Sequence, residues 1–357
     1  MDFLKSVQKG VERRIEAARG VRPEENSPEY RSRAAEVVPA DVRMFSGCMD
    51  SQTSADVSDV SSFGLPPVTG PEKAGGACTN ALLSVAGKQP NLTFGNLLLE
   101  MQKVLKSRRY SQVPQLSSSR QINLKEERFT LHNPNPNGRT KALLIGINYY
   151  GQKGELSGCV NDVKQIKTFL LANGYNASTM RILTDDPSFG DGMPTGDNII
   201  KGMRWLVEDN KPGDSLFFHY SGHGGQIPDD NGDEEDGMDE TLIPVDYQKE
   251  GQIRDDLIFK LLVVPLQAGA HMVALFDCCH SGTILDLPYM FVANDEGCSA
   301  VANGDVGGLG ANPLFNFAAA LQMIAEVAKG VIGGLSNASR DISWGGAKAF
   351  VGKLIGK

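Results

Sequence analysis

Several features that would point to particular classes of protein are scarce in this 357-residue chain. Lys and Arg number 35 against 43 Asp and Glu, and the net charge of −8 argues against nucleic acid as the main partner. The longest uncharged stretch, residues 306–325, is interrupted by Gly, Pro, Asn and Gln, and its apolar part is too short to cross a bilayer. The first twenty residues are broken by charges and lack the apolar core of a secretory signal. We therefore expect no stable membrane span and a cytoplasmic location.

Cysteine is also sparse. Six cysteines in a chain of this length, without a signal peptide, indicate reduced thiols and not a disulfide framework. Hydrophobic residues make up 41% of the chain and charged residues 22%, which is ordinary for a globular protein. The length allows one large domain or two ordinary ones with a sizeable core. We expect a monomer that uses no organic cofactor.

Strand-like and helix-like segments alternate from residue 140 onward. Apolar runs predict strands buried on both faces at residues 141–150, 214–222 and 271–279. Helical periodicity predicts helices between them, at residues 157–174, 195–210 and 255–266. Such alternation is typical of an α/β fold with a mostly parallel central sheet and helices on both faces. In open sheets of this kind, active sites lie beyond the carboxyl ends of the strands.

Composition divides the chain into five parts. We expect a peripheral helical extension at residues 1–37 and a small unit at residues 38–131. A linker at residues 132–139 leads to a larger catalytic unit at residues 140–292, and a Gly-rich helical tail covers residues 293–357. The small unit opens with a short strand, continues through a Ser/Pro/Gly-rich loop, and contains a helix for which Thr93 is a possible N-cap. The linker is assigned from its two Asn-Pro pairs and its Asn-Gly, which a helix or central strand does not accommodate.

Two of the predicted strands end in side chains suited to nucleophilic chemistry. His223 lies in a glycine-rich turn after one strand, and Cys278 and Cys279 follow the apolar body of another. If these strands are parallel neighbours, both ends meet at one edge of the sheet, which can place an imidazole beside a thiol, as a cysteine nucleophile requires. Adjacent cysteines in an extended chain point to opposite sides, so at most one faces this edge. Glycines here, such as Gly224, let the backbone present N–H donors to an oxyanion.

The segments "FFHYSGHGGQ" and "ALFDCCHSG" together resemble the paired signature of the metacaspases, a family of caspase-like cysteine proteases. His223 and Cys279 are 56 residues apart in the sequence, close to the spacing of about 50 expected for caspase-like enzymes. In that family the nucleophile is the Cys directly before His-Ser-Gly. The resemblance therefore assigns Cys279 as nucleophile and His223 as base, and it implies a caspase-haemoglobinase-like three-layer sandwich.

Residues 38–131 also resemble a metacaspase segment, namely the small unit that follows the catalytic unit in most members of the family. In this chain the small unit comes first, which is the order typical of type III metacaspases. Domains tolerate such a permutation when the termini involved are exposed. We expect the two units to pack as one continuous α/β domain.

Acidic residues near the predicted nucleophile suggest which substrates the protein would cleave. Asp277 precedes the cysteine pair, and Asp162 lies shortly after the first strand of the catalytic unit. Two carboxylates that converge on a pocket favour Arg or Lys through ion pairing and bidentate hydrogen bonds. The resemblance adds Cys159 and Ser221 to the pocket lining. Asp162 taken alone would equally suit the first turn of a helix, where it complements the helix dipole.

An acidic run over residues 229–240 has eight acids in twelve residues. Most such runs are solvated loops, and this one does not fit an EF-hand because Glu234 stands where that motif needs Gly. Calcium nevertheless accepts several carboxylate oxygens in flexible geometry. The resemblance implies activation by calcium, with ligands at Asp239, Asp255, Asp256 and Asp286.

Two other functions stay open at this point. One is a catalytically silent scaffold, because a fold alone does not guarantee activity. The other is a thiol redox sensor that uses both adjacent cysteines, although such pairs form only strained bridges and His223 would then be unexplained. A protease specific for Arg and Lys is also expected to cut itself, near Arg139 and Lys141 or in the basic N-terminal segment. The resemblance further suggests a part in stress response or programmed cell death.

Overall fold

The structure is a computed structural model, and it describes residues 27–47, 56–57, 75–89, 91–134, 138–228, 238–279, 281–305 and 307–333. The helix expected before residue 27, most of the acidic run and the end of the tail lie outside these residues.

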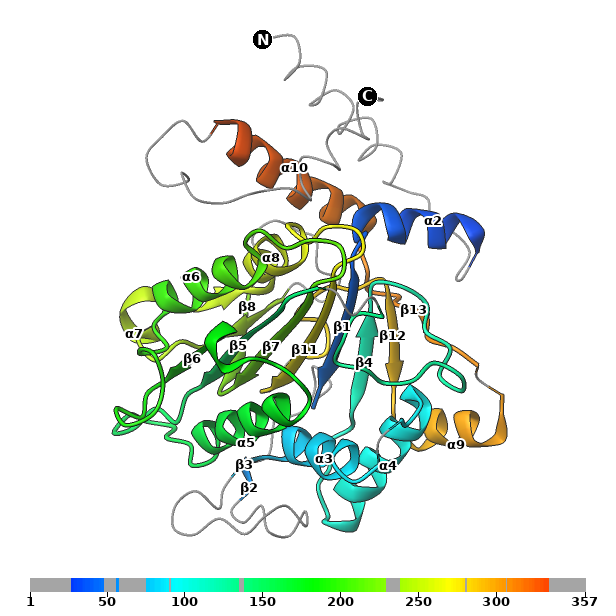
Figure 1. Cartoon of the computed structure of the whole chain (residues 1–357), viewed down its shortest axis with the longest axis horizontal. Helices are drawn as coiled ribbons and strands as arrows, with labels where there is room; N and C mark the ends of the chain where they lie inside the picture. Colours follow the sequence, from blue (N-terminus) through cyan, green and yellow to red (C-terminus); the bar gives the residue numbers. More distant parts are fainter. Residues whose placement is uncertain are drawn as a thin grey trace.

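An eight-stranded sheet forms the centre of the molecule, with the strand order β13-β12-β4-β1-β11-β7-β5-β6 (Figure 1). Its strands are β1 Asp41–Ser46, β4 Gln115–Ser118, β5 Thr140–Gly146, β6 Met180–Thr184, β7 Ser215–Ser221, β11 His271–Asp277, β12 Tyr289–Val292 and β13 Gly310–Ala311. The five strands from β1 to β6 in this order are parallel, and β4, β12 and β13 add antiparallel pairings at one side. The three predicted strands of the catalytic unit, β5, β7 and β11, are confirmed.

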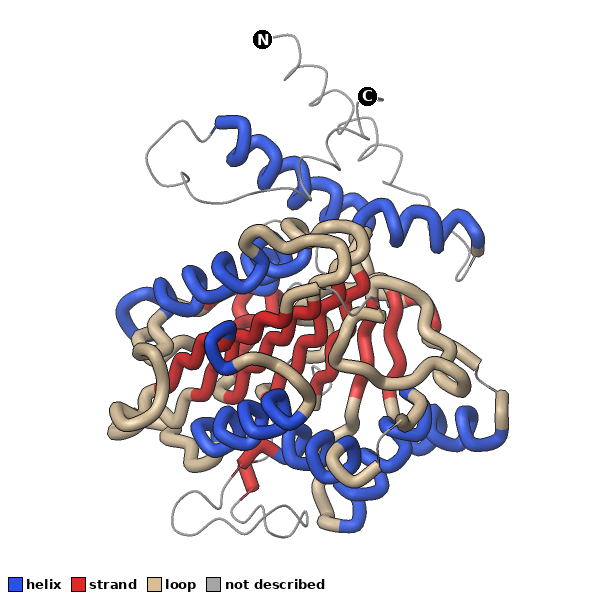
Figure 2. The backbone as a smooth tube through the Cα atoms, in the orientation of Figure 1, coloured by secondary structure: helices blue, strands red, loops and turns tan. Residues whose placement is uncertain are grey.

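Helices cover both faces of this sheet (Figure 2). One layer contains α3 Ala77–Ala86, α4 Phe94–Ser107, α5 Cys159–Ala172 and α9 Asp295–Asn303. The other contains α2 Pro28–Val37, α6 Gly196–Val207, α8 Asp255–Ile258 and α10 Phe317–Gly333. The predicted mostly parallel α/β sandwich with helices on both faces is therefore confirmed. Within the described part of the chain, no helix combines the length and the apolarity needed to cross a bilayer.

Two small sheets accompany the central one. The first is antiparallel, in the order β10-β9-β8, with β8 Gly224–Pro228, β9 Met238–Leu242 and β10 Ile253–Arg254. The second pairs β2 Asp56–Val57 with β3 Gly75–Gly76. A short helix, α7 Tyr247–Glu250, lies between β9 and β10 in the chain. The first small sheet matters for function because β8 begins directly after His223.

The small unit and the catalytic unit share the central sheet. β1, from the small unit, pairs with β11 of the catalytic unit along its whole length, and β4 of the small unit pairs with β12. At the start of β1, Asp41 contacts Nδ1 of His271 in β11 at 3.0 Å and pairs with Arg43 at 2.8 Å. Burial alone would raise the pKa of Asp41, but the hydrogen bond to His271 and the charge of Arg43 outweigh it and lower that pKa. The two units thus form one cooperative structure.

Residues 28–37, which were expected to lie at the periphery, form the helix α2, and this helix packs against the rest of the protein. The expectation of a peripheral segment is therefore wrong for these residues. Tyr30, Ala34 and Val37 of α2 are buried. The Tyr30 hydroxyl donates to the Pro288 carbonyl at 2.5 Å, and its ring packs edge-on against Phe317 of α10 with 5.1 Å between centroids. The apolar positions fall at i, i+4 and i+7 of a helix otherwise rich in charge, which gives a narrow stripe that α10 covers.

Candidate active site

The carboxyl ends of β7 and β11 lie side by side in the sheet. Ser221, the last residue of β7, is in register with Asp277, the last residue of β11. His223 follows two residues after one strand and Cys279 two residues after the other, so the sheet places both at the same edge, as the pattern predicts. Cys279 is partly exposed, whereas the neighbouring Cys278 is fully buried. The geometry therefore leaves Cys279 as the cysteine that a substrate can reach.

Gly224 brings the backbones of the two segments into contact. A Cβ atom built at Gly224 would lie 2.0 Å from the carbonyl oxygen of Cys279, a separation that real Cβ atoms do not show. Only glycine fits at this position, and the close approach follows from its missing side chain. The backbone that follows His223 therefore packs directly against the backbone at Cys279.

Tyr149, which the sequence reasoning does not single out, fixes the position of His223. Its hydroxyl accepts a hydrogen bond from the His223 backbone N–H at 3.0 Å and donates to the Ile243 carbonyl at 2.6 Å. The two rings lie with centroids 4.6 Å apart and tilted by 35°. Burial raises the pKa of Tyr149 far above the usual value for a phenol, so it stays a neutral hydroxyl. We interpret Tyr149 as a positioning residue for the imidazole.

The tautomer of His223 follows from its other contact. Nε2 lies 2.6 Å from the carbonyl oxygen of Gly154. A carbonyl oxygen only accepts, so a hydrogen bond here requires the proton on Nε2 and leaves Nδ1 as the basic nitrogen of the neutral ring. The Gly154 carbonyl thereby orients the base, as a third group does in other nucleophile–base pairs.

The predicted pocket acid Asp162 is fully buried and lies in the first turn of α5. Its Oδ2 accepts a hydrogen bond from the Ser221 hydroxyl at 2.7 Å. Since Ser221 is in register with Asp277, three of the four predicted pocket residues meet at the carboxyl edge of β7 and β11. Cys159, the fourth, begins α5 and is buried, and its N–H donates to Oδ1 of Asn148 at 2.9 Å.

The N-terminus of α3, from the small unit, lies between the two acids. The Gly76 N–H donates to Asp162 Oδ2 at 2.8 Å, and the Thr79 N–H donates to Asp277 Oδ2 at 2.7 Å. Asn80 adds a hydrogen bond from Nδ2 to Asp162 Oδ1 at 3.2 Å. A Cβ atom at Gly76 would lie 2.2 Å from Asp277 Oδ2, so glycine is required here. The pair of buried acids is therefore held jointly by the two units.

This helix is a second element that the sequence reasoning misses. The predicted Ser/Pro/Gly-rich loop ends at Gly76, and no element is predicted between it and α4. The segment "ACTNALLSVA", which follows a Gly-Gly pair, carries the signal of an apolar helix. The N-terminal N–H groups of α3 and the positive end of its dipole stabilise the buried carboxylates of Asp162 and Asp277.

The residues that the resemblance implies as calcium ligands are only partly brought together. Asp239 and Asp255 are both buried and close enough to interact. Burial raises the pKa of Asp255 to about 9, and the nearby negative charges of Glu240 and Asp239 contribute. Asp239 is paired with Arg254. With its pKa raised in this way, Asp255 is protonated at neutral pH, and a cation bound at this cluster would have to displace that proton.

The other two implied ligands are placed differently. Asp256 pairs with Lys260 at 3.2 Å, and that lysine also reaches Glu326 of α10 at 2.9 Å. The Asp286 N–H donates to the Thr283 carbonyl, in a turn where its own φ is +39°. Among the residues the structure describes, no three His, Cys, Asp or Glu side chains converge tightly enough to hold a metal ion.

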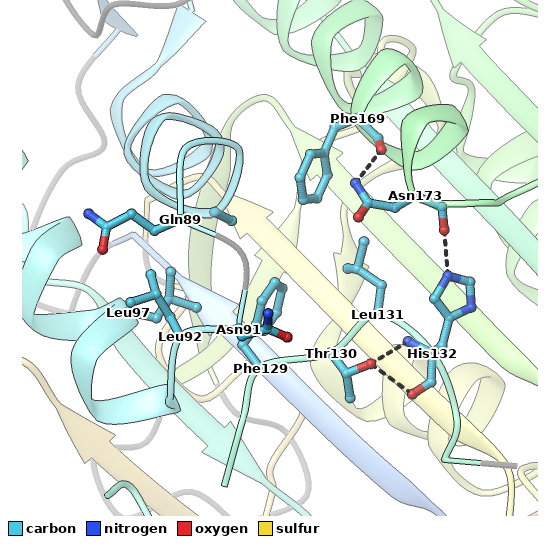
Figure 3. A pocket seen from close by; sticks show the side chains of 11 residues that line it. Gln89, Asn91, Leu92, Leu97, Phe129, Thr130, Leu131, His132, Phe169 and Asn173 are labelled. Carbon is cyan, nitrogen blue, oxygen red and sulfur yellow. Dashed lines mark hydrogen bonds between the residues drawn. The ribbon is translucent and has the colours of Figure 1, made fainter. Parts of the chain in front are cut away.

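A cavity of about 210 Å³ is lined by residues of both units (Figure 3). Leu92 and Leu97 from the small unit, Leu131 before the linker, and Phe169 from α5 contribute to its lining. On one side the His132 ring contacts the Asn173 carbonyl at 2.5 Å and closes the end of α5. None of the lining residues is a predicted site residue, so this cavity is a feature of the contact between units.

Comparison with known proteins identifies the family. The model of the family "Metacaspase, peptidase C14 domain" matches residues 140–288, and the "Caspase domain" model matches residues 7–124. Metacaspase III c of Phaeodactylum tricornutum is 46% identical over 274 residues, which cover 74% of this chain and 80% of that protein. Metacaspase-1A of Neosartorya fischeri is 51% identical over 189 residues, covering 48% of this chain and 43% of that protein. Metacaspase-1 of Emericella nidulans is also 51% identical over 189 residues, covering 47% of its length.

The two family models match on opposite sides of the linker, with the caspase-domain match first in the chain. The fungal relatives match over less than half of their own length, whereas the diatom protein matches over most of it and in both units. The chain therefore belongs to the metacaspases, with the unit order of type III, and is a cysteine-type endopeptidase of the caspase-like fold.

Proposed function

We propose that this metacaspase is a calcium-dependent endopeptidase that cleaves proteins after Arg or Lys, with Cys279 as nucleophile and His223 as base. The observation that carries the proposal is the shared edge of β7 and β11, where a partly exposed thiol and an oriented imidazole lie next to two buried carboxylates. This arrangement suits a redox pair poorly, since Cys278 is fully buried.

The chemistry follows from the orientation of His223. With the Nε2 proton held by Gly154, Nδ1 takes the thiol proton of Cys279, and the thiolate attacks the scissile carbonyl. The imidazolium then gives this proton to the leaving amine, which leaves an acyl-enzyme that water hydrolyses. Gly224, whose backbone packs against Cys279, would offer its N–H to the oxyanion that forms on the carbonyl oxygen.

Specificity for Arg or Lys rests on Asp162 and Asp277. The hydrogen bonds from α3 and Ser221 hold both carboxylates at the edge of the sheet where a substrate cation would enter. Both acids are almost completely buried, and a buried negative pair attracts a cation more strongly than exposed acids do. An Arg side chain would bind more tightly than Lys, because its planar guanidinium makes bidentate contacts with a carboxylate.

Calcium fits the all-oxygen donor set around Asp239 and Asp255. Asp255 and Asp239 are buried next to Glu240, and a divalent cation would compensate the charge of these carboxylates when they ionise. The residues that would hold it are Asp239, Asp255, Asp256 and Asp286, after Asp239 and Asp256 release Arg254 and Lys260. When bound, calcium would supply charge compensation and would join segments that flank the nucleophile.

Self-cleavage also stays a proposal, and the linker site is poorly suited to it. Arg139 is bound to buried Asp214 through its backbone N–H and its guanidinium. Lys141 lies inside β5, is buried, and donates to the Trp205 carbonyl. Cleavage after either residue would require β5 to open. The five described cysteines are free thiols, which suits the reducing, cytoplasmic setting that we also propose.

The proposal is tested by hydrolysis of fluorogenic peptides that end in Arg, Lys or Asp, each measured with millimolar calcium and with chelator. We expect the wild type to cleave the Arg and Lys peptides only with calcium, and Cys279→Ala to cleave none. Cleavage that persists in chelator would remove the calcium proposal. Preference for the Asp peptide would remove the assignment of the pocket acids.

A further inference from the structure

Glu240 is a buried carboxylate that neither the dyad nor the implied calcium site uses. It lies in the middle of β9, is only 2% exposed, and is in register with Gln226 of β8. β9 is the central strand of its three-stranded sheet and is bordered by β8 on one side and β10 on the other. Its position therefore connects the segment after His223 with the segment that leads to Asp255.

The side chain of Glu240 contacts both catalytic segments. Its Oε2 accepts a hydrogen bond from the Thr283 hydroxyl at 2.9 Å, and Thr283 lies four residues after Cys279. Its Oε1 accepts a hydrogen bond from Nε2 of Gln226 at 3.2 Å, and Gln226 lies three residues after His223. One buried carboxylate thus bridges the polypeptide after the nucleophile and the polypeptide after the base.

The backbone of the same residue contacts the acidic cluster. The Glu240 N–H donates to Oδ2 of Asp255 at 2.7 Å. Oδ1 of that aspartate accepts from the Asp256 N–H at 2.7 Å. A continuous series of hydrogen bonds therefore joins Asp255 to Glu240, and Glu240 to Thr283 and Gln226.

We propose that Glu240 is a positioning residue that holds the Cys279 and His223 segments in register and transmits occupancy of the acidic cluster to them. The proposal rests on the proposed calcium-dependent protease function. Because Cys279 and His223 come from separate strands, their separation depends on contacts made beyond the sheet edge. The Glu240 side chain makes such contacts to both segments, and its burial shields these hydrogen bonds from competing water.

The test uses Thr283, which offers a matched pair of variants. Thr283→Val keeps the shape but removes the hydroxyl, and Thr283→Ser keeps the hydroxyl. We expect Thr283→Val to lower kcat on an Arg peptide at least 10-fold with KM changed less than 3-fold, and Thr283→Ser to retain activity within about 3-fold. Glu240→Asp keeps the carboxylate but shortens its reach to both Thr283 and Gln226, so it should lower kcat at least as much as Thr283→Val. The double variant should be no worse than Glu240→Asp alone, because that variant already lacks the Thr283 contact.

Two further measurements distinguish a positioning role of Glu240 from a variant that has unfolded or that no longer binds calcium. For calorimetric titration with calcium, each variant is made in the Cys279→Ala background. Its dissociation constant for calcium should lie within about 3-fold of the value for Cys279→Ala alone. The melting temperature of each variant shows whether it is folded. The rate of Cys279 alkylation by iodoacetamide reports the thiol without any substrate. Calcium should accelerate this rate in the wild type and in Thr283→Ser but not in Thr283→Val.

Three results would overturn the proposal. They are unchanged kcat in folded Thr283→Val, losses that multiply in the double variant, and a loss of activity that is fully explained by weaker calcium binding. Failure of the wild type to cleave Arg or Lys peptides would instead count against the proposed function. In that case the alkylation rates still decide whether Glu240 positions the thiol.

Discussion

Asp162→Asn is expected to lower kcat/KM on Arg and Lys peptides by roughly two to three orders of magnitude. The substitution keeps the size of the side chain but removes the buried negative charge that would pair with the substrate. Removing one partner of a buried, hydrogen-bonded charge pair costs about 2–5 kcal/mol, and each 1.4 kcal/mol is tenfold in rate. Asparagine also turns a donor toward the N–H of Gly76 or the hydroxyl of Ser221, both of which donate to this carboxylate now.

A matched control exists for this prediction. Asp197 is the acid in the first turn of α6, as Asp162 is in α5, but its side chain is exposed and is paired with Lys201 on its own helix. Asp197→Asn should leave kcat/KM within about 2-fold, which separates a pocket acid from a helix-dipole acid. Peptide hydrolysis gives the main readout, and the rate of Cys279 alkylation by iodoacetamide should stay unchanged in Asp162→Asn. An equal fall in that alkylation rate would show that Asp162 supports the fold and not the pocket.

Acid is expected to destabilise the protein through His219, which lies inside β7. Its ring is fully buried, and burial lowers its pKa from 6.5 to about 3. Among the described atoms, its Nδ1 has no hydrogen-bond partner, and its Nε2 lies 3.3 Å from the Thr79 hydroxyl of α3. The folded state keeps this histidine neutral, whereas the unfolded chain takes up a proton below about pH 6.5. The contribution of neutral His219 to the free energy of unfolding is therefore fully present above pH 6.5 and is lost as the pH falls toward 3.

The expected loss at pH 5 relative to pH 7.5 is about 2 kcal/mol from this group, at 1.4 kcal/mol for each pH unit below 6.5. His219→Gln cannot take up this proton, so it should show a correspondingly shallower fall. Urea unfolding of both proteins at pH 7.5, 6 and 5 measures the difference, and carboxylates common to both proteins cancel in the comparison. Parallel pH profiles for the wild type and His219→Gln would contradict this account.

The parts of the fold that the sequence predicts are those with strong local patterns. β5, β7 and β11 are continuous apolar runs, and α4 begins after Thr93, whose hydroxyl accepts from the Asn96 N–H as a cap. Gly174, the predicted stop of α5, has a φ of +87°, which favours glycine. β4 and β12 have only four residues each, too few to show an alternation, and pairing with neighbouring strands stabilises both.

The segment over residues 255–266 shows how burial changes a predicted helix. It was expected to be one regular helix, but α8 ends at Ile258 and residues Phe259–Val263 form a π-helical stretch. Phe259, Leu261, Leu262 and Val263 are all buried. A regular helix would turn part of such an apolar run toward solvent, and the wider π-helical turn keeps these side chains inside.

The candidate site also contains residues that a local sequence pattern predicts and residues that only the folded structure reveals. His223 and Cys279 could be found because each directly follows a strand with a clear pattern, and parallel pairing brings such ends together. Tyr149, Gly154 and Glu240 act through contacts between segments far apart in the chain, which no local pattern reveals. The enclosure of Asp162 by the N-terminus of α3 depends on how two units share one sheet.

The most direct test of the central claim is to identify the cysteine that reacts with a peptidyl chloromethyl ketone ending in Arg. Intact mass and peptide mapping, in the presence of calcium, should show one modification, on Cys279. His223→Ala should slow this reaction at least about 100-fold, in keeping with the contribution of a general base. Modification of Cys278, or a rate that does not depend on His223, would contradict the assignment of the catalytic pair.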